Sequence, residues 1–324
     1  MLSESDFVKK QIIVVSPKNG DKISFKNDNI VIENSDGDIK HQSSCYRLFA
    51  IFIIGGVNVT SGIIAKSKKF GFSIVLFTMG FKVYSTINFS LEGNTLLRKR
   101  QYNTEKSSEI AQHIIINKIQ NQRDTLIKIR NENINDGIDL LDKFINMLSS
   151  KAYSISEIMG IEGTASKVYF NRLFKEFGWN GRQPRLKLDK INLLMDIGYT
   201  VLFNYLEAVL NIYGFDIYKG NLHQEFYKRK SLVCDIIEPF RPIVDYKIRK
   251  MFNLGQFNQF KFNVINNQYQ LKFEDSNKFV SLILSEIMEY KVVVFQYVQQ
   301  FYRWLMKGKD ILYFPKVFLK NDSC

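Results

Sequence analysis

The first part of the chain alternates short apolar runs with turn residues, a pattern typical of strands in a small sheet. The runs QIIVVS, KISF and NIVIEN come first, and the step Asp36-Gly37 that follows them is typical of a hairpin turn. LFAIFII (residues 48–54) and SIVLFT (73–78) are continuous apolar runs that predict buried strands, and TSGIIAKSKKFG between them predicts a helix. We therefore expect a small sheet with one crossover helix.

After YSTINFSLEGN the apolar residues recur at spacings of three and four, the period of an amphipathic helix. The run SEIAQHIIINKIQNQRDTLIKI (108–129) is the clearest example, and the pattern stays helical to the end of the chain. The sequence therefore predicts an α+β protein. A small N-terminal β-rich domain (1–90) precedes a larger all-α domain (91–324).

Two helices of the second part have recognisable ends. SISEIMGIEGTASKVYFNRLFKEFG opens with Ser154 and Glu157 at the spacing of a capping box and closes at Gly178, in the position of a C-terminal cap. DKINLLMDIGYTVLFNYLEAVLNIYG begins with Asp189, a good N-cap residue. Both segments are long enough to form the framework of the α-helical domain.

Glu162 stands between Gly160 and Gly163 inside the first of these helices. Each glycine costs about 1 kcal/mol relative to alanine in a helix, so a benefit should offset both. Close approach of another backbone to Glu162 is one such benefit. The alternative is a tight helix crossing in which Glu162 is only solvated.

The net charge of the chain indicates what kind of partner it binds. The chain has 324 residues, of which 45% are hydrophobic, and 45 Lys and Arg against 32 Asp and Glu give a net charge of +13. Such an excess favours a polyanionic partner, above all nucleic acid. The longest uncharged run, 48–65, is interrupted by glycine and polar residues and is too short to span a bilayer, so no membrane partner is expected.

The number and spacing of the cysteines indicate the cellular compartment. The chain has three, Cys45, Cys234 and Cys324, which are far apart and form no CxxC pair. They indicate neither a disulfide framework nor a thiolate zinc site. No signal peptide precedes the first apolar run. We expect a cytoplasmic protein.

The loop NGRQPRLKL between the two helices is basic, with six basic and two acidic residues from Arg172 to Lys190. It is interpreted either as a solvated loop or as a phosphate-binding segment. Aromatic residues occur among these bases and further along the chain, where they stack on bases or belong to the core. They are Tyr169, Phe170, Phe174, Trp179, Phe226 and Tyr227.

The stretch GNLHQEFYKRKSLVCDIIEPFRP (220–242) holds His223 in basic surroundings, followed by Asp235 and Glu238. Ser231 is a natural N-cap for a short helix that places the two carboxylates one turn apart, and the prolines that follow must interrupt it. If His223 folds back over this helix, one imidazole and two carboxylates suit Mg²⁺ or Mn²⁺. The alternative is an ordinary surface or core histidine.

Three sequence blocks resemble those of the CRISPR-associated integrase, the metal-dependent DNA endonuclease of spacer acquisition. They are MGIEGTASKVYF, KINLLMDIGYTVL and GNLHQEFYKRKSLVCDIIEPFRP, in the same order and at similar spacing. The run IFIIGGVNVTSGIIAKSKKFGFSIVLFTMGFKVYSTI is similar to the family's β domain, and NTLLRKRQY to its first helical block. Nearly the whole chain takes part in the resemblance.

The resemblance implies a catalytic metal site made of Glu162, His223 and Glu238, with Mg²⁺ or Mn²⁺ as cofactor. Many members have aspartate where Glu238 stands, and the longer side chain here would affect the geometry of the metal. The residues in supporting roles would be Asp235, Arg229, Ser231, Tyr169 and Asn192. The helix of Glu162 would have to approach the segment of His223 closely, which would account for the neighbouring glycines.

The implied reaction is transesterification, in which a DNA 3′-OH attacks a phosphodiester of the CRISPR repeat; water in its place would give nicking. Double-stranded DNA would be held by basic residues near the site, namely Arg172, Arg182, Arg185, Lys187, Lys228, Lys230 and Arg241. A non-catalytic DNA-binding scaffold and a stand-alone metal-dependent repair nuclease remain as alternatives.

The family further implies a homodimer that joins a small CRISPR adaptation subunit in a larger integration complex. In this family the N-terminal domains form much of the dimer contact. The runs FAIFII and SIVLF agree with such a dimer, since they offer more apolar surface than a domain of about 90 residues would easily bury alone.

Overall fold

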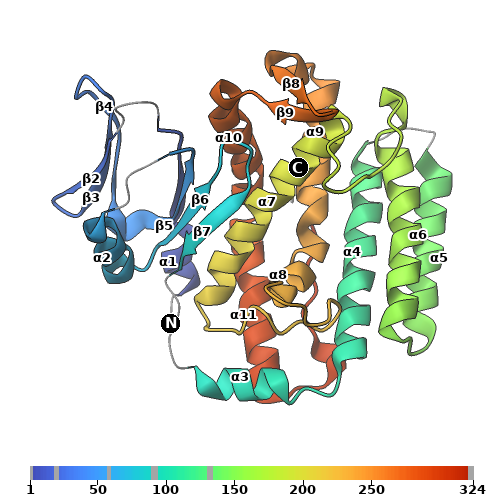
Figure 1. The fold of residues 1–324 in the computed structure, drawn as a ribbon. Coiled ribbons are helices and arrows are strands. Elements are labelled where there is room, and N and C mark those ends of the chain that lie inside the picture. Colours follow the sequence, from blue (N-terminus) through green and yellow to red (C-terminus); the bar gives the residue numbers. More distant parts are fainter. Residues whose placement is uncertain (1–2, 18–21, 57–59, 89–93, 130–133, 320–324) are drawn as a thin grey trace.

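The computed structural model describes residues 3–17, 22–56, 60–88, 94–129 and 134–319. The strand-rich N-terminal part lies on one side of the molecule and helices form the rest, so the predicted α+β class is confirmed (Figure 1). The N-terminal elements are α1 (Glu4–Val8), β1 (Gln11–Val15), β2 (Lys22–Lys26), β3 (Asn29–Glu33), β4 (Ile39–Ser44), β5 (Leu48–Ile54), α2 (Ser61–Phe70), β6 (Ser73–Phe77) and β7 (Val83–Ile87).

The N-terminal strands form two sheets. The first has the order β1-β5-β6-β7, in which β1, β5 and β6 are parallel and β7 is antiparallel. Helix α2 connects the parallel neighbours β5 and β6, which confirms the predicted crossover helix. The second sheet, β2-β3-β4, is antiparallel. Its turn between β3 and β4 contains Asp36 and Gly37, and Gly37 has a φ of +88°, a conformation that favours glycine. The hairpin prediction is confirmed.

Strands β5 and β6 are buried on both faces within this chain. One face, with Phe52 and Phe77, joins the core of the helical part, and the other, with Ile51 and Ile74, packs with Ile30 of the second sheet. The prediction that β5 and β6 leave apolar surface for a second copy of the chain is therefore wrong. A homodimer itself stays a prediction.

The helical part contains long helices and one added hairpin (Figure 1). The elements are α3 (Thr95–Tyr102), α4 (Ser107–Ile129), α5 (Asn135–Ser150), α6 (Ile155–Leu173), α7 (Lys190–Asn211), α8 (Ser231–Ile236), η4 (Glu238–Phe240), α9 (Arg241–Asn253), β8 (Phe262–Ile265), β9 (Gln268–Leu271), α10 (Phe273–Glu289) and α11 (Lys291–Lys307). The boundary predicted between residues 90 and 91 lies outside the described residues. The core is continuous from β5 and β6 into these helices.

Helix α7 is the central element of the helical part. It contacts β5 as well as α8, α9, α10 and α11, and Figure 1 shows it between the first sheet and the other helices. Among the described helices, α7 alone is long and apolar enough to cross a membrane, but 83% of its apolar window is buried inside the protein. Its composition is that of a core helix.

Two details of the helical part differ from the sequence prediction. The pattern is not helical to the end, because β8 and β9 form a hairpin whose turn residues Asn266 and Asn267 have φ of +51° and +59°. Asparagine tolerates this conformation, which such two-residue turns require. Helix α6 ends at Leu173, and a 3-10 turn (Lys175–Phe177) separates it from Gly178. Gly178 therefore caps that turn and not α6.

Candidate metal and nucleic-acid site

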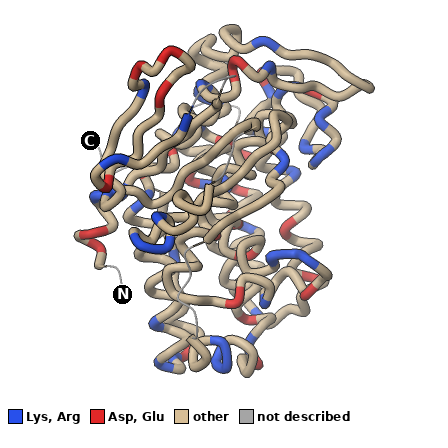
Figure 2. Tube along the Cα trace, turned by 60° about the vertical axis from the view of Figure 1, so that its left-hand side comes forward, with Lys and Arg blue, Asp and Glu red and all other residues tan. Residues whose placement is uncertain are grey.

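A pocket of about 1380 Å³ opens where the N-terminal part meets the helices. Its walls come from the start of β7, from α4, α6, α7, α8, η4 and α9, and from the loops that precede α7 and α8. The lining includes nine Lys and Arg but only four Asp and Glu. Basic residues also occur along the whole length of the molecule in the view of Figure 2. The pocket is thus the place where positive charge meets a small group of carboxylates.

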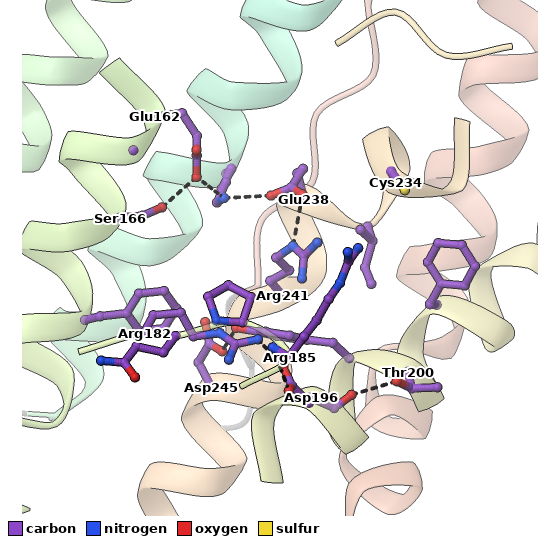
Figure 3. A pocket seen from close by; sticks show the side chains of 18 of the residues that line it. Glu162, Ser166, Arg182, Arg185, Asp196, Thr200, Cys234, Glu238, Arg241 and Asp245 are labelled. Atoms are coloured by element: carbon purple, nitrogen blue, oxygen red, sulfur yellow. Dashed lines mark hydrogen bonds and ion pairs between the residues drawn. The ribbon is translucent and has the colours of Figure 1, made fainter. Parts of the chain in front are cut away.

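Glu162 of α6 and Glu238 of η4 meet at one buried cation on the floor of this pocket (Figure 3). The Nζ of Lys118, on α4, donates a hydrogen bond to Glu238 Oε2 at 2.6 Å and another to Glu162 Oε1. Ser166 Oγ donates to the same oxygen of Glu162 at 2.7 Å, and Arg241 Nε donates to Glu238 Oε1 at 3.0 Å. Two carboxylates from separate elements therefore converge on a single positive centre.

The charges of this cluster hold one another in the ionised state. Burial alone would raise the pKa of Glu238, but the positive charges of Arg241 and Lys118 lower it to about 2. Burial would likewise lower the pKa of Lys118, but Glu238 and Glu162 raise it above its ordinary value. At neutral pH the floor of the pocket therefore carries buried, ionised groups.

His223 lines the same pocket and is fixed by Asp235 of α8. The carboxylate of Asp235 accepts the backbone N–H groups of Asn221, Leu222 and His223 at 2.5 to 3.1 Å. It also accepts the His223 ring at Nδ1, at 2.8 Å. Because a carboxylate can only accept, Nδ1 carries a proton, and in the neutral imidazole Nε2 is then the nitrogen with the lone pair.

The three residues predicted as metal ligands thus share one pocket. In the part of the chain that the structure describes, no three His, Cys, Asp or Glu side chains lie close enough together to hold a metal ion. The ammonium of Lys118 instead bonds both Glu162 and Glu238. Their role as ligands stays a prediction.

Two predictions about the segment of residues 220–242 are corrected. Ser231 is not the N-cap of α8 but its first residue, and its buried Oγ accepts from Arg229 Nε at 3.2 Å and donates to the Gln224 carbonyl at 3.1 Å. Asp235 and Glu238 contact different partners, the His223 loop and the Lys118–Arg241 pair. The predicted interruption exists but begins earlier than expected, since α8 ends at Ile236 and Glu238 belongs to η4, which precedes α9.

The glycines beside Glu162 do not serve a close approach to any residue that the structure describes. A Cβ built at Gly160 or Gly163 would meet no atom within 4 Å. Both the predicted backbone approach and the predicted tight helix crossing are therefore wrong, although the capping box of Ser154 and Glu157 is confirmed. Gly163 lines the pocket, so the helix leaves open space next to Glu162.

The predicted DNA-binding cations fall into two groups. Four are engaged in ion pairs within the chain: Arg172 with Asp136, Arg182 with Asp196, Lys230 with Glu207 and Arg241 with Glu238. Arg172 also lies outside the pocket lining. Arg185, Lys187 and Lys228 line the pocket and form no ion pair with any residue that the structure describes. These three cations are the ones open to a phosphate.

Asn192 organises the basic loop before α7. Its Oδ1 accepts from Arg182 Nη1 at 2.9 Å and from the Gln183 backbone at 2.8 Å, and its Nδ2 donates to Asp189 and to the Gly181 carbonyl. Asp189 accepts the Asn192 backbone N–H at 2.7 Å, which confirms the predicted N-cap. The fully buried Asn192 therefore supports the pocket from behind.

Sequence reasoning missed Lys118 and Asp245. Lys118 could have been found from α4, where it forms a polar stripe at helical spacing with Asn121, Gln122 and Thr125, all of them buried. Asp245 had no such signal. It is fully buried, accepts a hydrogen bond from the Tyr199 hydroxyl, and lies near the buried Tyr169. Tyr169 is therefore a core residue, and cannot stack on a base.

Burial raises the pKa of Asp245 to about 7, although the hydrogen bond of Tyr199 and the charge of Arg241 act in the opposite direction. The folded protein then binds this proton more tightly than the unfolded chain does. The stability that results is complete below pH 3.8, the ordinary pKa, and is lost as the pH rises through 7.

We therefore expect Asp245→Asn to gain stability relative to the wild type as the pH rises from about 4 to 7, because asparagine still accepts from Tyr199 but cannot ionise. Chemical denaturation of both proteins between pH 4 and pH 8 measures this. Asp142→Asn, at a carboxylate on α5 that is 43% exposed, is the control. A difference between Asp245→Asn and the wild type that does not vary with pH would contradict the assignment.

The fold and the pocket together define a class of protein, in which a β-rich N-terminal part is followed by a helical part that carries two carboxylates on one cation and a histidine in basic surroundings. The family model described as CRISPR associated protein Cas1 matches residues 14–284, and the chain therefore belongs to the Cas1 family. This agrees with the resemblance found in the sequence.

Similarity to individual proteins supports the assignment to this family. The chain is 30% identical over 278 residues to a protein of Thermodesulfovibrio yellowstonii named CRISPR-associated endonuclease Cas1 1, covering 81% of this chain and 87% of the relative. A structure described as a casposase bound to integration product matches with a TM-score of 0.76 and 22% identity, covering 93% of this chain and 92% of that one. A chain of a Cas6-RT-Cas1–Cas2 complex matches with a TM-score of 0.78 and 22% identity, covering 97% of this chain and 36% of that longer one.

Proposed function

We propose that this protein is a metal-dependent DNA endonuclease and integrase that inserts foreign DNA fragments into the CRISPR repeat array. One observation carries the proposal: Glu162 and Glu238 bond the same buried cation in a basic pocket that also contains His223. Carboxylates gathered around one positive centre, with an imidazole nearby, are donors that Mg²⁺ and Mn²⁺ accept. The names of the relatives, an endonuclease and a casposase bound to integration product, support the same chemistry.

The donor types suit such an ion, and Glu162, His223 and Glu238 would hold it in place of the Lys118 ammonium that bonds both glutamates. When bound, Mg²⁺ or Mn²⁺ would polarise the phosphodiester and favour deprotonation of the attacking hydroxyl. His223 would offer Nε2, because Asp235 holds the proton on Nδ1 and thereby fixes the tautomer. Arg241 holds the second oxygen of Glu238, which keeps that carboxylate in one orientation.

The reaction would be a transesterification at phosphorus. The oxygen of a DNA 3′-OH forms a bond to the phosphorus of a repeat phosphodiester, and the bond from that phosphorus to the 3′ oxygen of the neighbouring repeat nucleotide breaks. The proton that the attacking hydroxyl loses is balanced by the one that the departing 3′ oxygen takes up. Water in place of the 3′-OH gives a nick. Arg185, Lys187 and Lys228 would bind the flanking phosphates, since they have no ion pair within the described chain. The open space at Gly163 would admit the strand beside Glu162.

The partners follow from the same proposal. The protein would bind double-stranded DNA, both the captured fragment and the repeat, and would act as a homodimer with a small CRISPR adaptation subunit. The match to a chain of a Cas6-RT-Cas1–Cas2 complex supports the second subunit.

Purified protein tests the activity directly. With Mn²⁺ or Mg²⁺ it should cleave branched DNA and join a 3′-OH fragment to a repeat-bearing plasmid, and a chelator should stop both reactions. DNA binding with neither cleavage nor joining would favour a non-catalytic scaffold. Cleavage without joining would instead favour a repair nuclease.

Charge reversal tests how the DNA is held. Arg185→Glu and Lys187→Glu should each weaken binding to unrelated DNA sequences by about tenfold at moderate salt and should flatten its salt dependence, because each removes a phosphate contact. Fluorescence anisotropy at several salt concentrations measures both effects. Lys26→Glu, at an exposed lysine of β2, is the control. If all three variants weakened DNA binding equally, the loss of affinity would be a general effect of net charge, and Arg185 and Lys187 would have no specific contact with a phosphate.

A further inference from the structure

We propose that Phe226 and Tyr227 form a stacking platform for an unpaired DNA base next to the pocket, which neither ring lines but their neighbour Lys228 does. This inference rests on the proposed function and adds a binding subsite to it. Phe226 and Tyr227 are 72% and 80% exposed, and they are neighbours at the tip of the loop that joins His223 to α8. Single exposed apolar side chains are ordinary, but two adjacent large rings beside a basic pocket are not.

The loop that carries the two rings is fixed at its base. The Gln224 carbonyl accepts hydrogen bonds from the Ser231 hydroxyl at 3.1 Å and from the guanidinium of Arg229, so both ends of the loop are joined. The Arg229 backbone N–H donates to the Phe226 carbonyl at 2.9 Å, which closes a turn at the tip. The two rings therefore project from a loop held by internal hydrogen bonds, and they lose little conformational freedom when a base stacks on them.

The start of the loop is held just as closely. A Cβ at Gly220 would lie 2.6 Å from the His223 carbonyl and 2.8 Å from the Ser231 Cβ, so this backbone packs directly on the two residues that frame the loop. Asp235 then binds the backbone up to His223. The histidine of the proposed site and the aromatic tip are consequently parts of one rigid unit.

Charge and distance favour a nucleotide as the partner of the rings. Lys228 Nζ lies over the Tyr227 ring, 5.0 Å from its centre, and Arg229 Cζ lies over that of Phe226 at 5.8 Å. A cation therefore covers one face of each ring, a base would stack on the other face, and Lys228 can meet its phosphate. Lys228 also lines the pocket. Tyr227 follows His223 by four residues, at most about 14 Å of chain, which is about four steps of stacked nucleotides.

A base must be unpaired to present its whole face to a ring, and stacking of this kind tolerates any base. Such a base can come from an overhang on the attacking strand or from the distorted target duplex. Both sources share the same chemistry, and different DNA substrates distinguish them.

Binding by the full-length protein in the presence of a chelator tests the platform apart from catalysis. Three duplexes with equal numbers of phosphates serve as probes: one blunt, one with an unpaired 3′ end, and one with an internal unpaired base. We expect the Phe226→Ala/Tyr227→Ala double variant to bind one or both unpaired probes about tenfold to a hundredfold more weakly than the wild type. Its binding to the blunt duplex should change by less than about threefold.

Three comparisons make the test specific. Tyr227→Trp should retain binding, whereas removal of the unpaired base from the probe should abolish the difference between wild type and double variant. Tyr313→Ala is the matched control, because Tyr313 is 70% exposed and has Lys309 Nζ at 5.6 Å, but Lys309, unlike Lys228, does not line the pocket. Circular dichroism checks that the variants fold.

The affected probe identifies the source of the base: the 3′-end probe indicates the attacking strand and the internal probe the target. If the double variant bound all probes like the wild type, or lost the blunt duplex to the same extent, the platform would be refuted. If the wild type bound none of the probes, the proposed function would fail instead.

Discussion

Replacing Glu238 with glutamine is expected to lower DNA cleavage and strand joining by about a thousandfold or more, and Glu162→Gln and His223→Ala should do the same. The three side chains would hold one ion, so that losing any of them removes most of the effect of all three. Double variants should therefore be only slightly worse than single ones. Processing of branched DNA with Mn²⁺ and with Mg²⁺ by the purified variants measures this.

Stability must be followed in the same experiment, because Glu238 is buried between two cations. Its replacement leaves Arg241 without this counter-charge and Lys118 with Glu162 alone, and such losses typically cost about 3–5 kcal/mol. Circular dichroism and DNA binding of each variant separate unfolding from loss of chemistry, and Glu289→Gln, at an exposed end of α10, is the control. Wild-type activity in a folded His223→Ala protein would remove the imidazole from the proposed site.

The second large effect is expected at Lys118. Lys118→Met should destabilise the metal-free protein by about 3–5 kcal/mol, because Glu162 and Glu238 would lose the cation between them and only Glu238 would keep an ion pair, with Arg241. Mn²⁺ should raise the melting temperature of this variant more than that of the wild type, since an ion that binds only the folded state stabilises it. Thermal melting with and without Mn²⁺ measures both changes.

Lys247→Met is the matched control for this prediction. Lys247 and Glu286 form an ion pair whose side chains are only 13% and 12% exposed, and neither residue lines the pocket. This variant should lose stability without any gain in its response to Mn²⁺. If Lys118→Met and the wild type responded equally to Mn²⁺, the two carboxylates would not be a metal site.

Local chemistry in the sequence was enough to predict many elements of this protein. The capping box at Ser154, the N-cap at Asp189 and the hairpin turn at Gly37 were predicted correctly because each depends on residues within a few positions of one another. Periodicity placed β5, β6 and α4 in the same way. Predictions failed where a side chain bonds a partner outside its own helix. The hydroxyl of Ser231, for example, bonds the carbonyl of a residue seven positions earlier and caps no helix.

The candidate site could be predicted only in part. The resemblance to a known family selected Glu162, His223 and Glu238, and the structure brings them to one pocket. It could not indicate that Lys118 lies between the two glutamates, because that contact joins positions 44 and 120 residues apart. Nor could it separate the cations that have an internal partner, such as Arg182, from those that do not, such as Arg185.

By itself the sequence determined the α+β class, the starts of α6 and α7, several strands, the excess of positive charge and the residue types of the site, since these follow from local propensity, periodicity and composition. The tertiary structure alone decided which charges are neutralised within the chain, which apolar strands are covered, which aromatic rings stay exposed, and that the glycines beside Glu162 face open space. The physical reason is that burial and ion pairing depend on what the folded chain brings together from distant positions. A pattern of neighbours along the sequence does not contain that information.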